Sequence, residues 1–539
     1  MAKVLNYESQ IGQGEVIQSW HVSQSVDAFT GVEDYDITLS GSFTLSGSAK
    51  IEVAELSTST KPFVLSYDAS TGQVFKMNTS SIDDGDGANE VYTTSSNDNN
   101  IVPAKFGSNK AGGNFAVVTG GSSNSASADQ SFIGAGTLNT ASGGCSVIVG
   151  GVNNSSSGDF TFIGSGNKNK VNASGGVIGG GDQNQVTGTC GGVVSGLCNL
   201  ASGAWSFVGA GFKNSSSNAI SAIVAGHSNN IDGQTSFIGA GNKNYISGHA
   251  ASVVGGTENT SSACRSFIGG GCFNVTNSTG SVIAGGKLNC IANKSDFATI
   301  AGGCANNIVG TNSCCSFIGG GSLNCISGNS SGIGAGLQNS ASAFASFIGS
   351  GCKNQLAASY SFLGSGRSNC NYGDQNGLVG GNVNELTLNT QCSFLGGGQF
   401  NYMNTAKSVI VGGECNRINR PTMVTSTHSG IVSGFCNNLT ASRAVIGAGC
   451  KNQISETGTS SGILAGDENT ITHACSFVIG ANITSHASCT THVNNLTVSG
   501  SNGGGAGASI VIMRGLPTSD PTNVGQVWND SGTLKISAG

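Results

Sequence analysis

The most regular feature of the chain is a short apolar segment that returns about every 15 residues. Between residues 113 and 481 the chain reads S-[FV]-[IV]-x-[GA]-G-x-x-N-x-[IASV]-x-[SG]-x-x, and SFIGAGNKNYISGHA (236–250) is one complete copy. Aromatic and β-branched residues bounded by Gly-x-x-Asn are typical of a short strand followed by a turn. The second half of each copy, such as NYISG, suits another short strand. We therefore predict two strands and two turns in every copy.

An asparagine marks the register of this repeat. It recurs at a spacing of 15 from Asn124 to Asn289, and then at spacings of 15, 17, 18 or 21 to Asn469, which gives 23 copies. The period is too short for helix pairs or propeller blades. Two or three Gly in every copy also disfavour a helix, because each costs about 1 kcal/mol in a helix interior. The repeat predicts an all-β fold, a parallel β-roll or β-solenoid of about 23 coils.

Alternation along the apolar strand separates two faces, because successive side chains of a strand point in opposite directions. We expect the third residue of the motif to form the aliphatic ladder of the core: Ile133, Ile148, Ile163, Ile178, Val194, Val208, Ile223, Ile238, Val254 and Ile268. The second residue forms the opposite face, where bulky rings alternate with smaller residues: Phe132, Phe162, Phe237 and Phe267.

The second apolar face needs a partner surface. A coil of two strands is too thin to bury both faces, and an exposed apolar stripe of this length would aggregate. Symmetric assembly of identical chains is the economical solution. We therefore expect these phenylalanines to face neighbouring copies, with Gly at the fourth position leaving room for the rings. Which of the two ladders faces the axis of the assembly stays open.

The repeat asparagines have a structural interpretation. Asn tolerates the left-handed backbone conformation and bonds to nearby backbone in turns, and stacked Asn side chains form ladders. We expect Asn139, Asn169, Asn244 and Asn274 to act in this way. The neighbouring glycines serve turns and close packing. A phosphate-binding loop is excluded, because no GK[ST] occurs and no helical pattern follows.

Composition excludes several classes of function. The net charge is −6, only 9% of residues are charged, and no Lys/Arg cluster is present, which argues against nucleic-acid binding. No apolar run approaches the roughly 20 residues that span a bilayer. The N-terminal residues lack the pattern of a signal peptide. We therefore expect no membrane insertion, and assembly in the cytoplasm of the cell that makes the protein.

Candidate chemistry is sparse. The 18 Cys contain no CxxC, so we expect free structural thiols, no metal and no cofactor. A glycosidase needs two carboxylates within about 5 to 10 Å, whereas the acidic residues of the repeats are scattered. His occurs without H-x-H or HExxH. We expect no enzymatic activity; a polysaccharide-degrading tailspike is the less favoured enzymatic alternative.

The places where the period lengthens are better candidates for a site. The insertion RINRPTMVTSTH (417–428) adds six residues to one coil, and smaller extensions lie at 293–298, 307–315 and 387–392. Insertions in solenoids map to surface loops and often to the binding face. The residues we select as candidate receptor contacts are Arg417, Arg420, His428 and, near the C-terminus, Trp528.

The motif SFIGAGxxNxASG resembles the head repeat of YadA-like trimeric autotransporter adhesins, whose motif runs close to SVAIGxxAxASG, over about two thirds of the chain. That resemblance implies a left-handed parallel β-roll wound as a trimer around an apolar centre. The flanks resemble fibre proteins of tailed phages, cyanophages particularly. They are WHVSQSVDAFTGVEDYDITLSGSFTLSGS (20–48), PFVLSYDASTGQVFKM (62–77), with two alternating strands around a turn, and GLPTSDPTNVGQVWNDSGTLKISAG (515–539).

Together the repeat and the flanks suggest a homotrimeric virion fibre, such as a tail fibre, that adheres to a host surface. Residues 1–112 would form a β region that attaches to other virion proteins, residues 113–481 a β-roll shaft, and residues 482–539 a β cap or tip. The partner would be a host cell-surface glycan or protein. A head fibre or capsid decoration protein with a purely structural role is the alternative.

Overall fold

The computed structural model describes residues 3–4, 35–36, 63–68, 73–78, 92–94, 100–103, 108–310, 312–419, 428–494, 518–520, 526–531 and 533–538. The chain divides into two compact units, residues 1–166 and residues 167–539. The described residues of both units form strands and turns and no helix. The predicted fold class is confirmed: the chain is a parallel β-solenoid with about 25 turns of about 15 residues.

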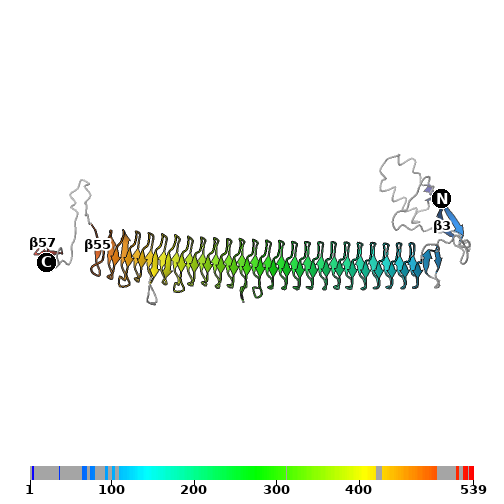
Figure 1. Ribbon diagram of the computed structural model, residues 1–539, viewed down its shortest axis with the longest axis horizontal. Helices are drawn as coiled ribbons and strands as arrows, with labels where there is room; N and C mark the ends of the chain where they lie inside the picture. The colour runs from blue at the N-terminus through cyan, green and yellow to red at the C-terminus, as the bar shows by residue number, and fades with distance from the viewer. Residues whose placement is uncertain are drawn as a thin grey trace. The chain divides into compact units, whose positions relative to one another are not determined.

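One coil of the second unit illustrates the repeat. β24 (Phe237–Ile238) leads through a turn to β25 (Tyr245–Ile246), and a second turn leads to β26 (Ser252–Val253). β26 lies parallel to β24, with Ser252 opposite Phe237 and Val253 opposite Ile238. The two-residue strands of successive coils therefore stack side by side, as the green-to-orange part of Figure 1 shows.

Two parallel sheets result in the second unit. Strands that follow the repeat Ser form what we call the Phe sheet, from β16 (Val177–Ile178) to β54 (Phe477–Ile479), with β55 (Thr491–Val493) paired to β54. Strands that follow the repeat Asn form the Asn sheet, from β15 (Lys170–Val171) to β53 (Thr470–Ile471). The hairpin of β56 (Val527–Asp530) and β57 (Thr533–Ile536) lies in the C-terminal segment.

The first unit contains the same coil. Its Phe sheet includes β8 (Val117–Val118) to β14 (Phe162–Ile163), and its Asn sheet runs from β7 (Lys110–Ala111) to β13 (Ser155–Ser156). β6 (Ile101–Pro103) pairs with β8 and with β5 (Tyr92–Thr94). β3 (Phe63–Asp68) and β4 (Gln73–Asn78) form the antiparallel hairpin expected for residues 62–77. β1 (Lys3–Val4) pairs with β2 (Tyr35–Asp36).

Backbone hydrogen bonds connect each coil to its neighbours in both directions. Strand residues donate to the following coil, as in Tyr245 N to Asn259 O at 2.9 Å. Two turn residues of each coil have a left-handed backbone, for example Ala250 (φ 54) and Glu258 (φ 55). Ala250 N donates to Gln234 O and Glu258 N to Asn242 O, both at 2.9 Å, so these residues bond to the preceding coil.

The core is the aliphatic ladder inside the coils. Ile133, Ile163, Ile238 and Ile268 are fully buried. Two members of the sequence-derived ladder are wrong, because Val194 and Val254 are 54% and 48% exposed. The core positions there belong to the preceding residues, Val193 and Val253, which are buried. Each of these two coils carries two adjacent valines, and a shift of one residue in the assignment exchanges the inward and outward faces of the strand.

The repeat asparagines are fully buried and form a ladder. Asn274 Nδ2 donates to Gly270 O (2.9 Å), Gly286 O (3.0 Å) and Asn259 Oδ1 (3.1 Å), and its Oδ1 accepts from Asn289 N (3.1 Å). Asn139, Asn169 and Asn244 likewise bond to the following glycine turn, at 2.9 to 3.0 Å. Their expected left-handed backbone is a wrong prediction. The preceding residue adopts it instead, as in Lys243 (φ 54) and Phe273 (φ 57).

Candidate functional site: the insertion edge

The two turns of a coil differ in how much variation they accept. One turn joins each Asn-sheet strand to the next Phe-sheet strand, and we call the side of the second unit formed by these turns the insertion edge. Every coil longer than 15 residues has its extra residues there, in the segments β31 (Cys290–Ile291) to β32 (Thr299–Ile300), β33 (Asn307–Ile308) to β34 (Phe317–Ile318), β43 (Glu385–Leu386) to β44 (Phe394–Leu395), β47 (Arg417–Asn419) to β48 (Gly430–Ile431), and β51 (Gln453–Ile454) to β52 (Gly462–Ala465). The described loops project from one side of the unit (Figure 1).

The opposite turn, which we call the glycine turn, has a constant length for a physical reason. It contains a glycine with positive φ, such as Gly271 (φ +85), a left-handed residue and the buried Asn. The Asn side chain bonds to the turn of the next coil. An added residue would break this ladder, whereas the described turns of the insertion edge contain no continuous ladder of buried amides. Insertions in the second unit are therefore confined to the insertion edge.

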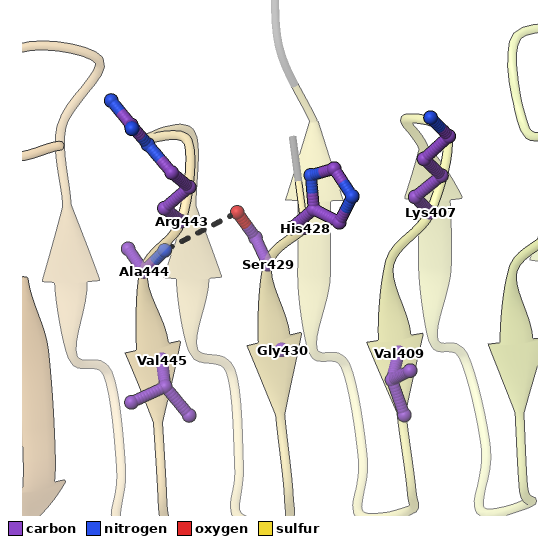
Figure 2. A pocket seen from close by; sticks show the side chains of 8 residues that line it. All are labelled: Lys407, Val409, His428, Ser429, Gly430, Arg443, Ala444 and Val445. Carbon is purple, nitrogen blue, oxygen red and sulfur yellow. Dashed lines mark hydrogen bonds between the residues drawn. The ribbon is translucent and has the colours of Figure 1, made fainter. Parts of the chain in front are cut away.

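Three basic residues stand side by side on this edge. The register Val409–Gly430–Val445 places Lys407, His428 and Arg443 at equivalent positions on three consecutive coils. All three have a left-handed backbone, with φ of 52, 46 and 55, and all three are exposed. Figure 2 shows their side chains on the same side of the strands. We call Lys407, His428 and Arg443 the basic row.

An open hollow of about 350 Å³ lies next to the basic row. Its lower part is lined by Val409, Gly430 and Val445, and the missing side chain of Gly430 leaves a gap between the two valines (Figure 2). Ser429 is buried and its hydroxyl donates to Ala441 O at 2.7 Å, which fixes the strand between its neighbours. The hollow therefore combines an apolar floor with a positively charged rim.

The structure brings only one of the predicted contacts to this hollow. His428 lines it, whereas Arg417 lies on the outward side of β47, with its guanidinium 4.7 Å from the ring centroid of Tyr402. Arg420 lies outside the described residues. Trp528 belongs to β56, and its side chain is outside the described part of the chain. Lys407 and Arg443 were missed, although counting back two residues from each Phe-sheet strand would have aligned them with His428.

Large apolar side chains also reach solvent along the insertion edge. Trp205, Phe297 and Tyr360 occupy the left-handed position of this turn, and all three are more than 60% exposed. Tyr360 also makes an edge contact with Phe344, at 5.3 Å between ring centroids. Aromatic residues are enriched at surfaces that bind other proteins.

Other ionisable groups of the described residues serve local contacts. Glu258 pairs with Lys243 at 3.5 Å and Glu468 with Lys451 at 3.4 Å. All 18 cysteines are free and are half-buried or exposed on turns and outer faces, and burial raises the pKa of the Cys290 and Cys325 thiols. In the described residues, no group of three or more His, Cys, Asp or Glu side chains is arranged as metal ligands would be.

A histidine group lies at the last described coils. His492 pairs with Val478, an inward-facing core residue, and its ring centroid lies 5.7 Å from that of His486. The His492 side chain is half-buried at the end of the Phe sheet. Burial, followed by the neighbouring His486 and His473, lowers the pKa of His492 below its ordinary value of 6.5.

The lowered pKa predicts a pH-dependent end of the solenoid. The unfolded chain binds a proton at His492 more tightly than the folded chain does. The last coils therefore have their full stability above pH 6.5, and they lose stability as the pH falls below that value. We expect hydrogen-exchange protection of β54 and β55 to decrease from pH 8 to pH 5. His492→Leu should remove much of that dependence, and His227→Gln, remote in the same unit, should not. Equal pH dependence in His492→Leu would contradict this assignment.

In the described residues, no helix has the length and apolar composition needed to cross a membrane. A scan against protein-family models finds no match, and a search of curated proteins finds no similar chain.

Proposed function

We propose that the protein is a rigid fibre protein of a tailed-phage virion that adheres to a host surface, and that three copies assemble along the Phe sheet. The observation that carries the proposal is a division of the coil into three different surfaces. The Phe sheet presents an uncharged apolar face, the Asn sheet presents mostly polar side chains, and the insertion edge presents the variable, basic and aromatic residues. Such a coil supplies an assembly face and a recognition edge.

The outward face of the Phe sheet in the second unit supports assembly of identical chains. Phenylalanines recur along it, with Phe237 39% exposed and Phe317 43% exposed, and no outward position between β16 and β54 carries a charge. The rings lie over glycines, because a Cβ on Gly239 would be 3.6 Å from Phe237 Cε1. The rings recur along the sheet as far as Phe394, and another copy of this chain has the same period and the same apolar pattern.

Replacing stripe residues should separate the copies. We expect Phe317→Ser combined with Phe347→Ser to reduce the mass in light scattering from that of three chains to that of one, because each ring loses apolar contact worth roughly 1 to 2 kcal/mol in every chain. Tyr402→Ser on the outward side of the Asn sheet is the control and should leave the mass unchanged. An unchanged mass in the double variant, with β-structure retained by circular dichroism, would contradict this interface.

The location of the protein on its particle tests the proposed function. Electron microscopy with a labelled antibody should place the protein on the tail, and antibody to it should block attachment of the particle to cells. Labelling on the head would favour the second candidate, a head fibre or capsid decoration protein, for which the long uncharged assembly face is also suitable. Release of oligosaccharide from host polysaccharide by the purified protein would instead show an enzyme.

A further inference from the structure

The basic row is a concentration of positive charge in a chain whose formal net charge is −6. Lys407, His428 and Arg443 stand on consecutive coils, and stacked strands lie about 4.8 Å apart, so the row extends over roughly 10 Å. Two ion pairs among the described residues lie elsewhere, at Lys243–Glu258 and Lys451–Glu468. In sequence, residues 404–409, 419–430 and 440–445 contain no Asp or Glu. The row therefore lacks a neutralising carboxylate on its own turns.

The hollow beside the row is open to solvent, so a ligand in it would keep one face in water. Its volume of about 350 Å³ is at the lower end of the roughly 300 to 1,000 Å³ that small-molecule sites occupy. Val409 and Val445 supply an apolar floor. Arg443 can hold a carboxylate or sulfate through two parallel N–H donors, and Lys407 adds a second positive charge two coils away. A ligand that uses both must be extended, with anionic groups separated by an apolar body.

We infer that this hollow binds an acidic saccharide, with its carboxylate or sulfate groups paired to Lys407 and Arg443. The ring of the sugar lies over Val409, Gly430 and Val445, and His428 contributes a hydrogen-bond donor between the two cations. The inference deepens the adhesive role proposed above, because it names the class of surface molecule that the insertion edge recognises. Val409, Gly430 and Val445 are outward positions of the Phe sheet, in a run of coils without phenylalanine at this position between Phe394 and Phe477. The inference therefore places these coils outside the contact between copies. Three copies then present three such hollows, and weak single contacts add up through multivalency.

Gly430 makes the hollow, and the fold itself supplies the residue that closes it. The same strand position carries Phe in other coils, such as Phe394 and Phe477. Gly430 does not have a positive φ, and a Cβ there would only approach Val409 O at 3.7 Å and Val445 Cγ2 at 4.0 Å. Gly430→Phe is therefore compatible with the coil. It fills the hollow and leaves the charge of the basic row unchanged.

Calorimetric titration of the full-length protein tests the inference. The probes are an oligogalacturonate, a sulfated dextran oligomer and a neutral dextran oligomer of the same length. We expect binding of the acidic probes only, weaker at higher salt. Lys407→Gln and Arg443→Gln should each reduce affinity about tenfold, because each removes a charge-assisted hydrogen bond, and Gly430→Phe should reduce it at least as much. Arg265→Gln, at the same turn position but with Ala250 and Gly280 at the equivalent positions of the neighbouring coils, should have no effect.

Three results would overturn the inference. Equal binding of the neutral oligomer would remove the role of the charges. Equal losses in Arg265→Gln and Arg443→Gln would show diffuse attraction, and unchanged binding in Gly430→Phe would show that the hollow is not used. These outcomes are separate from the proposed function: a labelled protein on the tail that binds no acidic probe contradicts only the saccharide site. Acid-specific binding by a protein found on the head contradicts only the tail-fibre role.

Discussion

Replacing Gly271 by Ala is expected to disrupt the solenoid locally and severely, whereas the same change at the adjacent Gly270 is expected to be harmless. Gly271 has φ +85, and a Cβ there would lie 2.0 Å from Gly286 O and 2.8 Å from Asn274 Nδ2. The strained backbone and the overlap with the next coil together should cost about 4 kcal/mol or more. The overlapping atoms belong to the backbone and to the buried Asn ladder, so the neighbouring coil cannot yield without losing its own hydrogen bonds.

Gly270 provides a matched control one residue away. A Cβ at Gly270 has no atom within 4 Å and needs no positive φ, so the change in stability should stay within about 0.5 kcal/mol. Hydrogen exchange is the appropriate measurement, because repeat structures open coil by coil. Protection should fall in the coils around residue 271 in the first variant and remain in the second. Similar protection in both variants would contradict the packing described for the glycine turn.

Asn274→Ala is expected to have the second-largest effect. The change removes the two N–H donors that serve Gly270 O, Gly286 O and Asn259 Oδ1, and it leaves the backbone amide of Asn289 without its side-chain acceptor. An unsatisfied buried polar group costs about 1 to 3 kcal/mol, so with the lost bonds the total should be about 3 kcal/mol. Asn277→Ala, at a half-buried position outside the ladder, is the control and should change the midpoint of urea unfolding little.

Asn274→Asp separates the contribution of the amide N–H donors from that of the shape of the side chain. The carboxylate retains the acceptor for Asn289 N, but it places negative charge beside Gly270 O, Gly286 O and Asn259 Oδ1, which are all acceptors. At neutral pH we therefore expect this isosteric variant to be at least as unstable as Asn274→Ala. A stable Asn274→Asp protein would show that the amide donors contribute little to the stacking of coils.

The coil could be predicted from sequence because its strongest signals are periodic. The spacing of Asn124 to Asn289 fixes the register, and the alternation at Phe237 and Ile238 assigns one side chain to the surface and the other to the core. The assignment of inward and outward residues was wrong where two neighbouring residues of the strand have the same character. In the coil with Val193 and Val194 both residues are β-branched and apolar, so only the distance from Asn184 shows which of them lies inside.

The turns were harder to predict because their conformation depends on the neighbouring coil. The left-handed residue before each Asn can be Lys243, Phe273 or Glu258, and these residues share no intrinsic preference for positive φ. Their conformation is imposed by the bond that each backbone amide donates to the preceding coil. The basic row was missed for a related reason: Lys407, His428 and Arg443 become neighbours only when the insertion in 417–428 is removed from the register.

The mass of the unmodified full-length protein under native conditions is the most direct test of the assembly along the Phe sheet. Native mass spectrometry should give three times the 53.5 kDa of a single chain, without a population of free chains at micromolar concentration. A single-chain mass for the folded protein would contradict the account, because the uncharged apolar face of the Phe sheet would then be left exposed to water along the whole second unit.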